Sequence, residues 1–358
     1  MTDILALDIG SGTQDILIYK NGREMENNFK MVLPSQTQVI ADKIHKCTEL
    51  GEDVFLYGHL MGGGASSKAI KNHLKAGYRV YATEQAALTI KDNLDRVKEQ
   101  GIHIVKESDK QESCLHIKDC CRIKLQDVDL QALEIALQQF EIDLPRDIII
   151  AVQDHGFSPD GSNRKFRFKH WENFLEQGGH LSQLLYEQKT IPDYFTRMEA
   201  AANCCQDIKQ DTRLWAMDTG AASILGAMED GKVAEAVKNG AVLINIGNQH
   251  TIAFLVYRDR VLGVFEHHTK MLTEQSLLQY IDKFVSGQLD NEQILNEHGH
   301  GCMVLPEAKK HTFDFWSVTG PKREIGEKLG YMAIPYGDMM MSGPYGMVNG
   351  LLKYGQRR

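Results

Sequence analysis

Cysteine motifs, long apolar runs and positive net charge are all missing from this sequence. The seven cysteines form neither a CxxC pair nor a CxxxCxxC set, which argues against a cysteine-rich zinc site, a thioredoxin-type redox centre and an iron–sulfur cluster. No apolar run approaches the roughly 18 residues that span a bilayer, and Asp3 and Asp8 near the start are not typical of a signal peptide. The net charge of −8 argues against binding to nucleic acid or to acidic membranes.

The remaining bulk properties are those of an ordinary globular protein. Hydrophobic residues make up 42% and charged residues 25% of the 358 positions, and this length favours two domains with sizeable cores. Because no secretory signal is present, we expect the cysteines to be reduced thiols in a cytoplasmic protein. The basic run RKFRFK at 164–169 is expected on a solvated edge, with an anion site as the alternative. The oligomeric state stays open.

Strands and helices alternate along the chain, which predicts an α/β fold. Strand-like runs come first at 3–7, 15–20 and 28–33, and a second group of three follows at 241–247, 250–257 and 260–267. Each group then changes to strand–helix alternation, which indicates a duplicated architecture. A long helix is expected over 84–101, whereas 106–127 and 156–197 show no pattern that assigns them.

The segment DIGSGT at 8–13 has the composition of a phosphate-binding turn. Gly10 and Gly12 let the backbone turn tightly and approach a ligand, and the amides of such a turn form a concave anion site. Asp8 ends the preceding strand and is a candidate for holding a hydrated Mg²⁺ ion. The candidate hydrogen-bonding side chains here are Ser11, Thr13 and Gln14. A purely structural β-turn is the alternative.

A second segment, LINIGNQHTIAFLV at 243–256, repeats this pattern of strand, glycine turn and strand. Two such hairpins facing each other would grip a triphosphate from opposite sides. Neither GxxxxGK[ST] nor a complete GxGxxG occurs, so no single-loop phosphate site competes with this interpretation. The candidate phosphate-binding residues of the second turn are Asn245, Gly247, Asn248, Gln249 and Thr251.

Three further segments are AMDTGAASILGA at 216–227, FWSVTGPKRE at 315–324 and MMMSGPYGMVNGLL at 339–352. Together with the two turns, and in this order along the chain, they resemble the signature segments of the superfamily of actin, sugar kinases and heat-shock chaperone ATPases. The resemblance implies two ribonuclease-H-like domains around an interdomain nucleotide cleft. It places the first domain at 1–230 with an α/β insertion at about 58–130, the second at 231–336, and a returning C-terminal helix at 337–358.

The resemblance also implies an adenosine-contacting loop formed by Gly320, Pro321, Lys322 and Arg323. Two departures bear on turnover. Asn245 stands where the superfamily usually has an acid, and Gly320–Pro321 replaces the usual paired glycines. Because proline cannot donate an amide hydrogen bond, these departures favour nucleotide binding over efficient turnover.

More narrowly, MGGGASSKAIKNHLKAGYRVYAT, AVQDHGFSP, NIGNQHTIAF, FEHHT and HGHG are similar to a prokaryotic family labelled as pyruvate formate-lyase activating enzymes. That label implies radical chemistry on an iron–sulfur cluster. The missing CxxxCxxC set argues against such chemistry in this chain.

The segment VQDHG at 152–156 follows a buried strand, where sugar kinases of this superfamily place a substrate-facing loop. Asp154 is therefore the candidate general base toward a hydroxyl or a water, and a turn capped by Asp154 and His155 is the alternative. The segment YGHLMGGGASS at 57–67 opens a helix and is a candidate site for an anionic second substrate or a partner, with a plain flexible turn as the alternative.

Histidines cluster near the C-terminal end in a pattern that suits Zn²⁺ or Fe²⁺. The candidates are His250, His267, His268, His298 and His300. Adjacent strand residues point to opposite faces, so His267 and His268 are not expected to bind one metal together. Histidines that are hydrogen-bonded in loops or contact a substrate are the alternative.

The leading hypothesis is therefore a cytoplasmic protein that binds Mg-ATP between two lobes and acts as an ATPase or small-molecule kinase. Asp8 and Asp154 are its candidate catalytic residues, and its partners would be the nucleotide and an unidentified small molecule or protein. A non-catalytic nucleotide switch and a histidine-rich metal-dependent enzyme on the same scaffold remain as alternatives.

Overall fold

The computed structural model describes residues 2–105, 119–206 and 211–355. A six-stranded sheet forms the core of the first half. Its strands β1, β2 and β3 are antiparallel neighbours, and β8 and β10 continue the sheet parallel to β1. In spatial order the strands are β3 (Phe29–Pro34), β2 (Thr13–Tyr19), β1 (Ile4–Ile9), β8 (Asp147–Val152), β10 (Arg213–Asp218) and β9 (Tyr186–Glu187).

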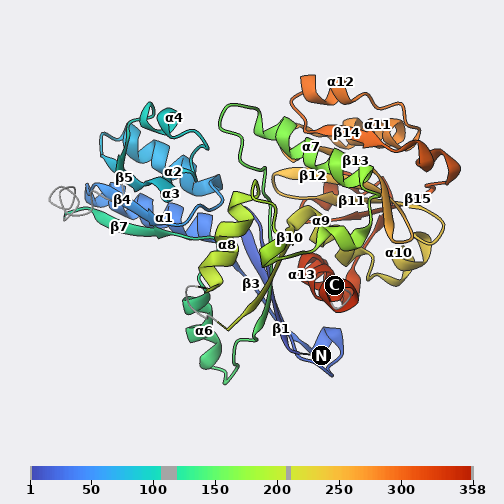
Figure 1. Cartoon of the computed structure of the whole chain (residues 1–358), viewed down its shortest axis with the longest axis horizontal. Coiled ribbons are helices and arrows are strands. Elements are labelled where there is room, and N and C mark those ends of the chain that lie inside the picture. The colour runs from blue at the N-terminus through green and yellow to red at the C-terminus, as the bar shows by residue number, and fades with distance from the viewer. Residues whose placement is uncertain (1, 106–118, 207–210, 356–358) are drawn as a thin grey trace.

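A second six-stranded sheet repeats this arrangement (Figure 1). Strands β11, β12 and β13 are antiparallel neighbours, and β15 and β16 follow β11 in parallel. In spatial order the strands are β14 (Gly301–Val304), β13 (Arg260–His268), β12 (His250–Tyr257), β11 (Ala241–Ile246), β15 (Phe315–Thr319) and β16 (Tyr331–Met332). The two sheets share five strands, β3-β2-β1-β8-β10 in the first and β13-β12-β11-β15-β16 in the second. When the five are counted in chain order, both sheets have the order 3-2-1-4-5, which is the ribonuclease-H-like topology. The expected pair of such domains, the actin-like ATPase fold, is confirmed.

Burial along the strands explains why the sequence pattern identified them. Every residue of β1 and of β8 is buried, as expected for central strands that are covered on both faces and therefore consist of continuous apolar runs. By contrast, β3 lies at the sheet edge and exposes most of its residues. Strong apolar runs thus mark the middle of each sheet.

Two helices, α9 (Thr219–Ala227) and α13 (Ser342–Tyr354), pack against each other between the two sheets (Figure 1). A Cβ atom on Gly226 would clash with the backbone of Ser342, and one on Gly346 would clash with the carbonyl of Ala222. The small residues of both segments are explained by this contact, because larger side chains would hold the two backbones apart.

A third sheet, entirely parallel, belongs to a separate unit at the left of Figure 1. Its strands are β6 (Ile102–Val105), β5 (Val80–Thr83), β4 (Val54–Gly58) and β7 (Cys121–Leu125). Helices α1 (Gln36–Leu50) and α2 (Gly64–Lys75) share a hydrophobic core with it. Because α1 and β4 pack into this core, the inserted unit begins near residue 36, earlier than the expected 58.

The long helix expected over 84–101 is wrong. The structure has two short helices instead, α3 (Glu84–Ala87) and α4 (Leu94–Lys98). The side chain of Asn93 caps α4 by accepting hydrogen bonds from the amides of Asp95 and Arg96. Just before it, Asp92 accepts a hydrogen bond from the Ser158 amide. Capping and this long-range contact outweigh the helical pattern.

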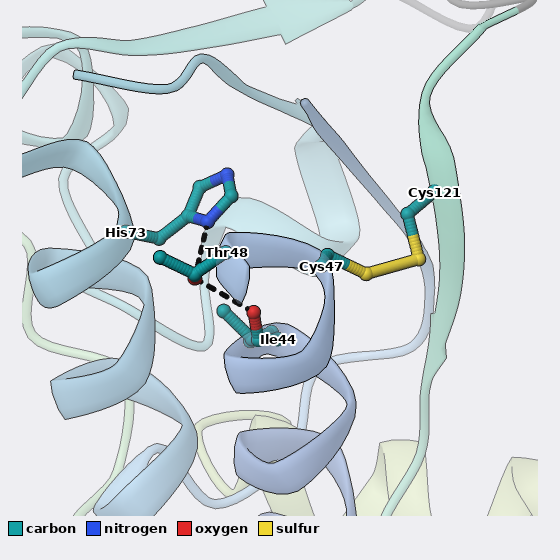
Figure 2. Close-up of a disulfide and its surroundings, with 5 residues drawn as sticks. All are labelled: Ile44, Cys47, Thr48, His73 and Cys121. Carbon is teal, nitrogen blue, oxygen red and sulfur yellow. Dashed lines mark hydrogen bonds between the residues drawn. A yellow bond between two sulfur atoms is a disulfide. The ribbon is translucent and has the colours of Figure 1, made fainter. Parts of the chain in front are cut away.

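The expectation that all cysteines are reduced is also wrong. Cys47 on α1 and Cys121 at the start of β7 form a disulfide within the inserted unit (Figure 2). Beside it, the Thr48 hydroxyl donates a hydrogen bond to the Ile44 carbonyl and lies 2.7 Å from Nδ1 of His73. Cys114 lies outside the described residues.

The basic run at 164–169 lies on helix α7 (Asn163–Glu176), and one of its members contradicts the expected solvated edge. Arg167 is buried, as are Phe168 and Trp171 on the same helix. The other α-helices of the described residues are α6 (Leu130–Gln138), α8 (Thr196–Gln206), α10 (Gly231–Ala236), α11 (Glu274–Val285) and α12 (Asn291–Asn296). Within the described ranges, none of the helices has both the length and the apolar character that a membrane crossing requires.

Candidate functional site

A cavity of about 410 Å³ lies where the two sheets, the inserted unit and the helices α9 and α13 meet. Both glycine turns line it, the first through Gly10, Ser11 and Thr13 and the second through Gly247, Asn248 and Gln249. The turns also come into contact, because a Cβ atom on Gly12 would lie 3.4 Å from Nδ2 of Asn248. The turns are also closed in the same way. The amide of Gly10 donates to the Thr13 carbonyl, and that of Gly247 donates to the His250 carbonyl, both at 2.9 Å.

The structure brings most of the sequence-predicted nucleotide residues to this cavity. Those that line it are Asp8, Gly10, Ser11, Thr13, Asn245, Gly247, Asn248, Gln249, Gly320 and Pro321. Gln14 is directed elsewhere, because its Nε2 donates to the Pro34 carbonyl. Thr251 is buried, and its hydroxyl lies 3.1 Å from that of Thr269. Gly12, Lys322 and Arg323 are not among the lining residues.

An acid that sequence reasoning missed lies beside Asp8. Asp15 on β2 is paired directly opposite Asp8 on β1, and both line the cavity. Burial and the neighbouring Asp15 raise the pKa of Asp8 to about 8, although the Thr219 hydroxyl donates to it at 2.6 Å. Burial likewise raises the pKa of Asp15 to about 7. Side chains two positions apart in a strand lie on the same face, and the two acids stand in opposite strands of one hairpin. The spacing of Thr13 and Asp15 was therefore the signal that could have revealed this pair.

Only a glycine fits at position 343, beside the Asp8 carboxylate. A Cβ atom on Gly343 of α13 would clash with Oδ2 of Asp8. One oxygen of Asp15, Oδ1, is buried and has no hydrogen-bond partner among the described residues. Two close carboxylates with an unpartnered oxygen are a donor set that suits a hard cation such as Mg²⁺.

The loop between β4 and α2 forms another wall of the cavity, through Leu60, Met61, Gly62, Gly63 and Gly64. Arg197 of α8 lies against Gly62 so closely that a side chain there would clash. Its guanidinium donates to both carboxylate oxygens of Asp127, at 2.8 and 3.0 Å, and to the Gln153 carbonyl at 2.8 Å. Arg197 therefore joins the inserted unit to the first sheet at the cavity, a role that its sequence surroundings did not reveal.

Asp154 lines the cavity, but its carboxylate is used by the backbone. Oδ1 accepts from the amide of Gly156 at 2.8 Å, and Oδ2 accepts from the amide of Met198 at 2.9 Å. Burial raises its pKa in spite of these bonds. The carboxylate thus holds the start of α8 against the end of β8, which is the arrangement expected of a capping residue.

A buried charge network lies behind this wall. Arg167 donates through Nε to both oxygens of Glu266, at 2.8 and 2.9 Å, and through Nη1 to Asp218 at 2.7 Å. Trp171 also donates to Glu266, at 3.0 Å. Although burial alone would raise the pKa of Glu266, Arg167 and neighbouring histidines hold it well below its usual value.

The histidine candidates separate into two groups. His250 and His300 lie together, with ring centroids 4.5 Å apart, and His268 lies 4.8 Å from each of them. His267 points away and stacks on Tyr280, as strand alternation predicts. His298 is exposed.

A further histidine, His155, joins the first group. Sequence reasoning treated it only as a turn residue. His155, His250 and His300 each offer one ligand atom, and these atoms all lie within 4.8 Å of one another.

The fold and this cavity define a two-domain protein of the actin-like ATPase fold. A family model described as "Putative pyruvate format-lyase activating enzyme (DUF1786)" matches residues 61–325, and the chain belongs to this family. No curated protein sequence matches the chain.

Solved structures with a similar fold include a Bacteroides thetaiotaomicron protein with an actin-like ATPase fold and unknown function, at 7% identity and a TM-score of 0.34 over 96% of this chain and 95% of that one. The ethanolamine utilization protein EutJ from Carboxydothermus hydrogenoformans has 9% identity and a TM-score of 0.31, over 96% and 88% of the two chains. The Aquifex aeolicus PPX-GPPA enzyme has 11% identity and a TM-score of 0.24, over 89% and 68%.

Proposed function

We propose that the protein binds Mg-ATP in the interdomain cavity and carries out phosphoryl transfer or ATP hydrolysis there. The observation that carries this proposal is that two matching glycine turns line one cavity and come into contact, with Gly12 next to Asn248. Turns of this kind offer backbone amides to a phosphate chain. The choice of ATP as the nucleotide rests on the fold, whereas the proposed contacts rest on the chain's own residues.

Asp8 and Asp15 would hold the magnesium ion, directly or through its water molecules. Their residue types fit such an ion, because the buried Asp8 stands opposite the half-buried Asp15 and one Asp15 oxygen lacks a partner among the described residues. When bound, the ion would neutralise charge on the phosphates, which is the main requirement of phosphoryl transfer. Gly320 and Pro321 would contact the adenosine.

The phosphate acceptor would enter between the nucleotide turns and the loop at 60–64. That loop lines the same cavity, and its last residue, Gly64, is the first residue of helix α2. An unidentified small molecule or a side chain of a partner protein would reach the terminal phosphate there. Asp154 remains the candidate base for such an acceptor.

A non-catalytic nucleotide switch is the second candidate function, and the bonding of Asp154 favours it. Both of its oxygens accept backbone amide hydrogen bonds, which leaves the carboxylate poorly placed to take a proton. In this alternative, nucleotide binding changes the relative position of the two sheets without turnover.

Calorimetry with Mg-ATP tests the proposal. We expect one binding site in the wild type and at least about tenfold weaker binding in Asp8→Asn, because a tenfold change corresponds to only about 1.4 kcal/mol. Asp8→Asn keeps the shape of the side chain and removes a buried carboxylate, so it is expected to fold. Asp3→Asn, which removes an acid outside the cavity, is the matched control and should bind as the wild type does.

Absence of Mg-ATP binding in the wild type, or equal binding in Asp8→Asn, would refute the proposal. Phosphate release over many turnovers then separates the two functions. Turnover that is lost in Asp8→Asn supports the enzyme, and tight binding without turnover supports the switch.

A further inference from the structure

We propose that His155, His250 and His300 bind one divalent transition-metal ion, with Zn²⁺ as the first candidate, at the wall of the interdomain cavity. The three residues come from separate parts of the chain. His155 follows β8 of the first sheet, whereas His250 begins β12 and His300 directly precedes β14 in the second sheet. One ligand atom of each residue lies within 4.8 Å of those of the other two.

The burial of His300 is the observation that packing does not explain. The side chain is fully buried, and neither of its ring nitrogens has a hydrogen-bond partner among the described residues. An unsatisfied buried polar group costs about 1–3 kcal/mol. A metal ion would use one of these nitrogens.

Glu266 orients the second ligand. Its Oε1 lies 3.2 Å from Nδ1 of His250, so a proton on Nδ1 leaves the Nε2 lone pair for a metal. Arg167 and Trp171 hold the same carboxylate through hydrogen bonds. A carboxylate that accepts the far N–H of a ligating histidine is the usual outer-shell arrangement of metal sites.

The charges around the three rings also suit a cation. Arg167 forms ion pairs with two acids, Glu266 and Asp218, so the group of these three side chains carries one excess negative charge before a metal binds. Imidazole nitrogen is a ligand that Zn²⁺, Fe²⁺ and Cu²⁺ share.

Metal binding would draw the ligands closer together. With metal–nitrogen bonds of about 2.1 Å, tetrahedral ligands lie roughly 3.4 Å apart, whereas here they lie within 4.8 Å. Rotation of the three side chains and a small approach of the two sheets would supply the difference. Metal binding would thus favour a closer approach of the two sheets.

Three protein ligands leave a fourth coordination position. His155 and His250 line the cavity, so the fourth ligand would come from the cavity as a water molecule or as an oxygen of a bound anion. Such a metal polarises a bound oxygen and lowers the pKa of a bound water. This gives the cavity a second chemical centre, separate from the Asp8–Asp15 pair.

The test uses the full chain, stripped with a chelator and titrated with Co²⁺ alone and then with Zn²⁺ alone, without nucleotide. We expect one equivalent of Co²⁺ to give visible d–d absorption of a nitrogen-ligated site, and Zn²⁺ to displace it. His250→Ala and His155→Gln should each weaken Co²⁺ binding by at least about 100-fold. Removal of a residue that only hydrogen-bonds to a metal ligand already weakens binding by up to about 100-fold, and removal of a ligand itself should cost at least as much.

His298→Ala is the matched control, because this exposed histidine belongs to the same HGHG segment and should bind Co²⁺ as the wild type does. Asp8→Asn should also keep the signal, which separates this site from the magnesium site. Because His155 lies on a loop, the His155→Gln variant keeps the assay informative if the His250→Ala variant fails to fold. Absence of stoichiometric Co²⁺ binding in the folded wild type, or unchanged binding in His155→Gln, would overturn the proposal.

Discussion

Arg167 of helix α7 and Glu266 of strand β13 form an ion pair whose side chains are only 3% and 0% exposed. The pair links an element from the first half of the chain to the sheet of the second half. The single Nε–H is shared between both carboxylate oxygens as a bifurcated hydrogen bond. The same arginine also contacts Asp218 and the Asp154 carbonyl, so it positions the walls of the cavity on both sides.

Replacement of Arg167 by Met is expected to destabilise the fold by about 3–5 kcal/mol, because it leaves Glu266 buried without its counter-ion. Urea denaturation followed by circular dichroism measures this change. Lys169→Met on the same helix is the control. Its partner Glu172 forms an exposed pair, so this variant should keep the wild-type midpoint. A wild-type midpoint in Arg167→Met would show that the buried pair contributes nothing.

Gly346→Ala is expected to destabilise the protein by about 1–3 kcal/mol or more, as overpacking does in tight cores. The added methyl group would meet the backbone of Ala222 and Gly226, which cannot move away as a side chain can. Gly231→Ala is the matched control, because no atom lies within 4 Å of its Cβ position. Differential scanning calorimetry should give a lower Tm only for Gly346→Ala. Equal melting of the two variants would contradict close contact of α9 and α13.

Stability is expected to fall in mild acid through His170. Burial, with a further contribution from Arg167, lowers the pKa of this histidine to about 4. Because the unfolded chain takes up the proton near pH 6.5, the stabilising contribution is complete above that pH and is lost progressively toward pH 4. The loss reaches about 3 kcal/mol, at 1.36 kcal/mol for each pH unit.

His170→Phe removes the titrating group and keeps an aromatic ring beside Phe195. The difference in unfolding free energy between wild type and this variant should therefore change with pH between 6.5 and 4. Urea titrations at half-unit steps measure it. A difference that stays constant over this range would rule out a buried neutral His170.

Reduction of the Cys47–Cys121 disulfide is expected to destabilise the inserted unit by about 2–4 kcal/mol, because the bond restrains the unfolded chain between residues 74 positions apart. Thermal melts with and without dithiothreitol measure the effect. Cys121→Ser should melt at the reduced wild-type temperature and be insensitive to the reductant. Cys302→Ser lies outside this pair and should keep the sensitivity of the wild type. A wild-type melt that does not change on reduction would contradict the bond.

Local pattern was enough to predict the first three strands of each large sheet and the two glycine turns, but it did not reveal the edge strands β9, β14 and β16. Buried strands such as β1 and β8 are continuous apolar runs, and the two glycine turns directly follow β1 and β11. Such features depend on residues close together in the chain, where periodicity and turn chemistry decide the conformation. The same reasoning failed at 84–101, where a side-chain cap and the contact of Asp92 with Ser158 interrupt the helix.

The composition of the site was decided by tertiary structure. Arg167 lies in a basic run that resembles an exposed edge, and its burial follows only from the packing of α7 against the second sheet. The grouping of His155 with His250 and His300 likewise depends on how the end of β8 meets the second sheet. Residues far apart in sequence come together because the apolar faces of separate sheets and helices must be buried against one another. The amino-acid sequence by itself therefore determined the first three strands of each large sheet and the glycine turns, whereas the packing of the sheets determined which charged and histidine side chains meet at the cavity.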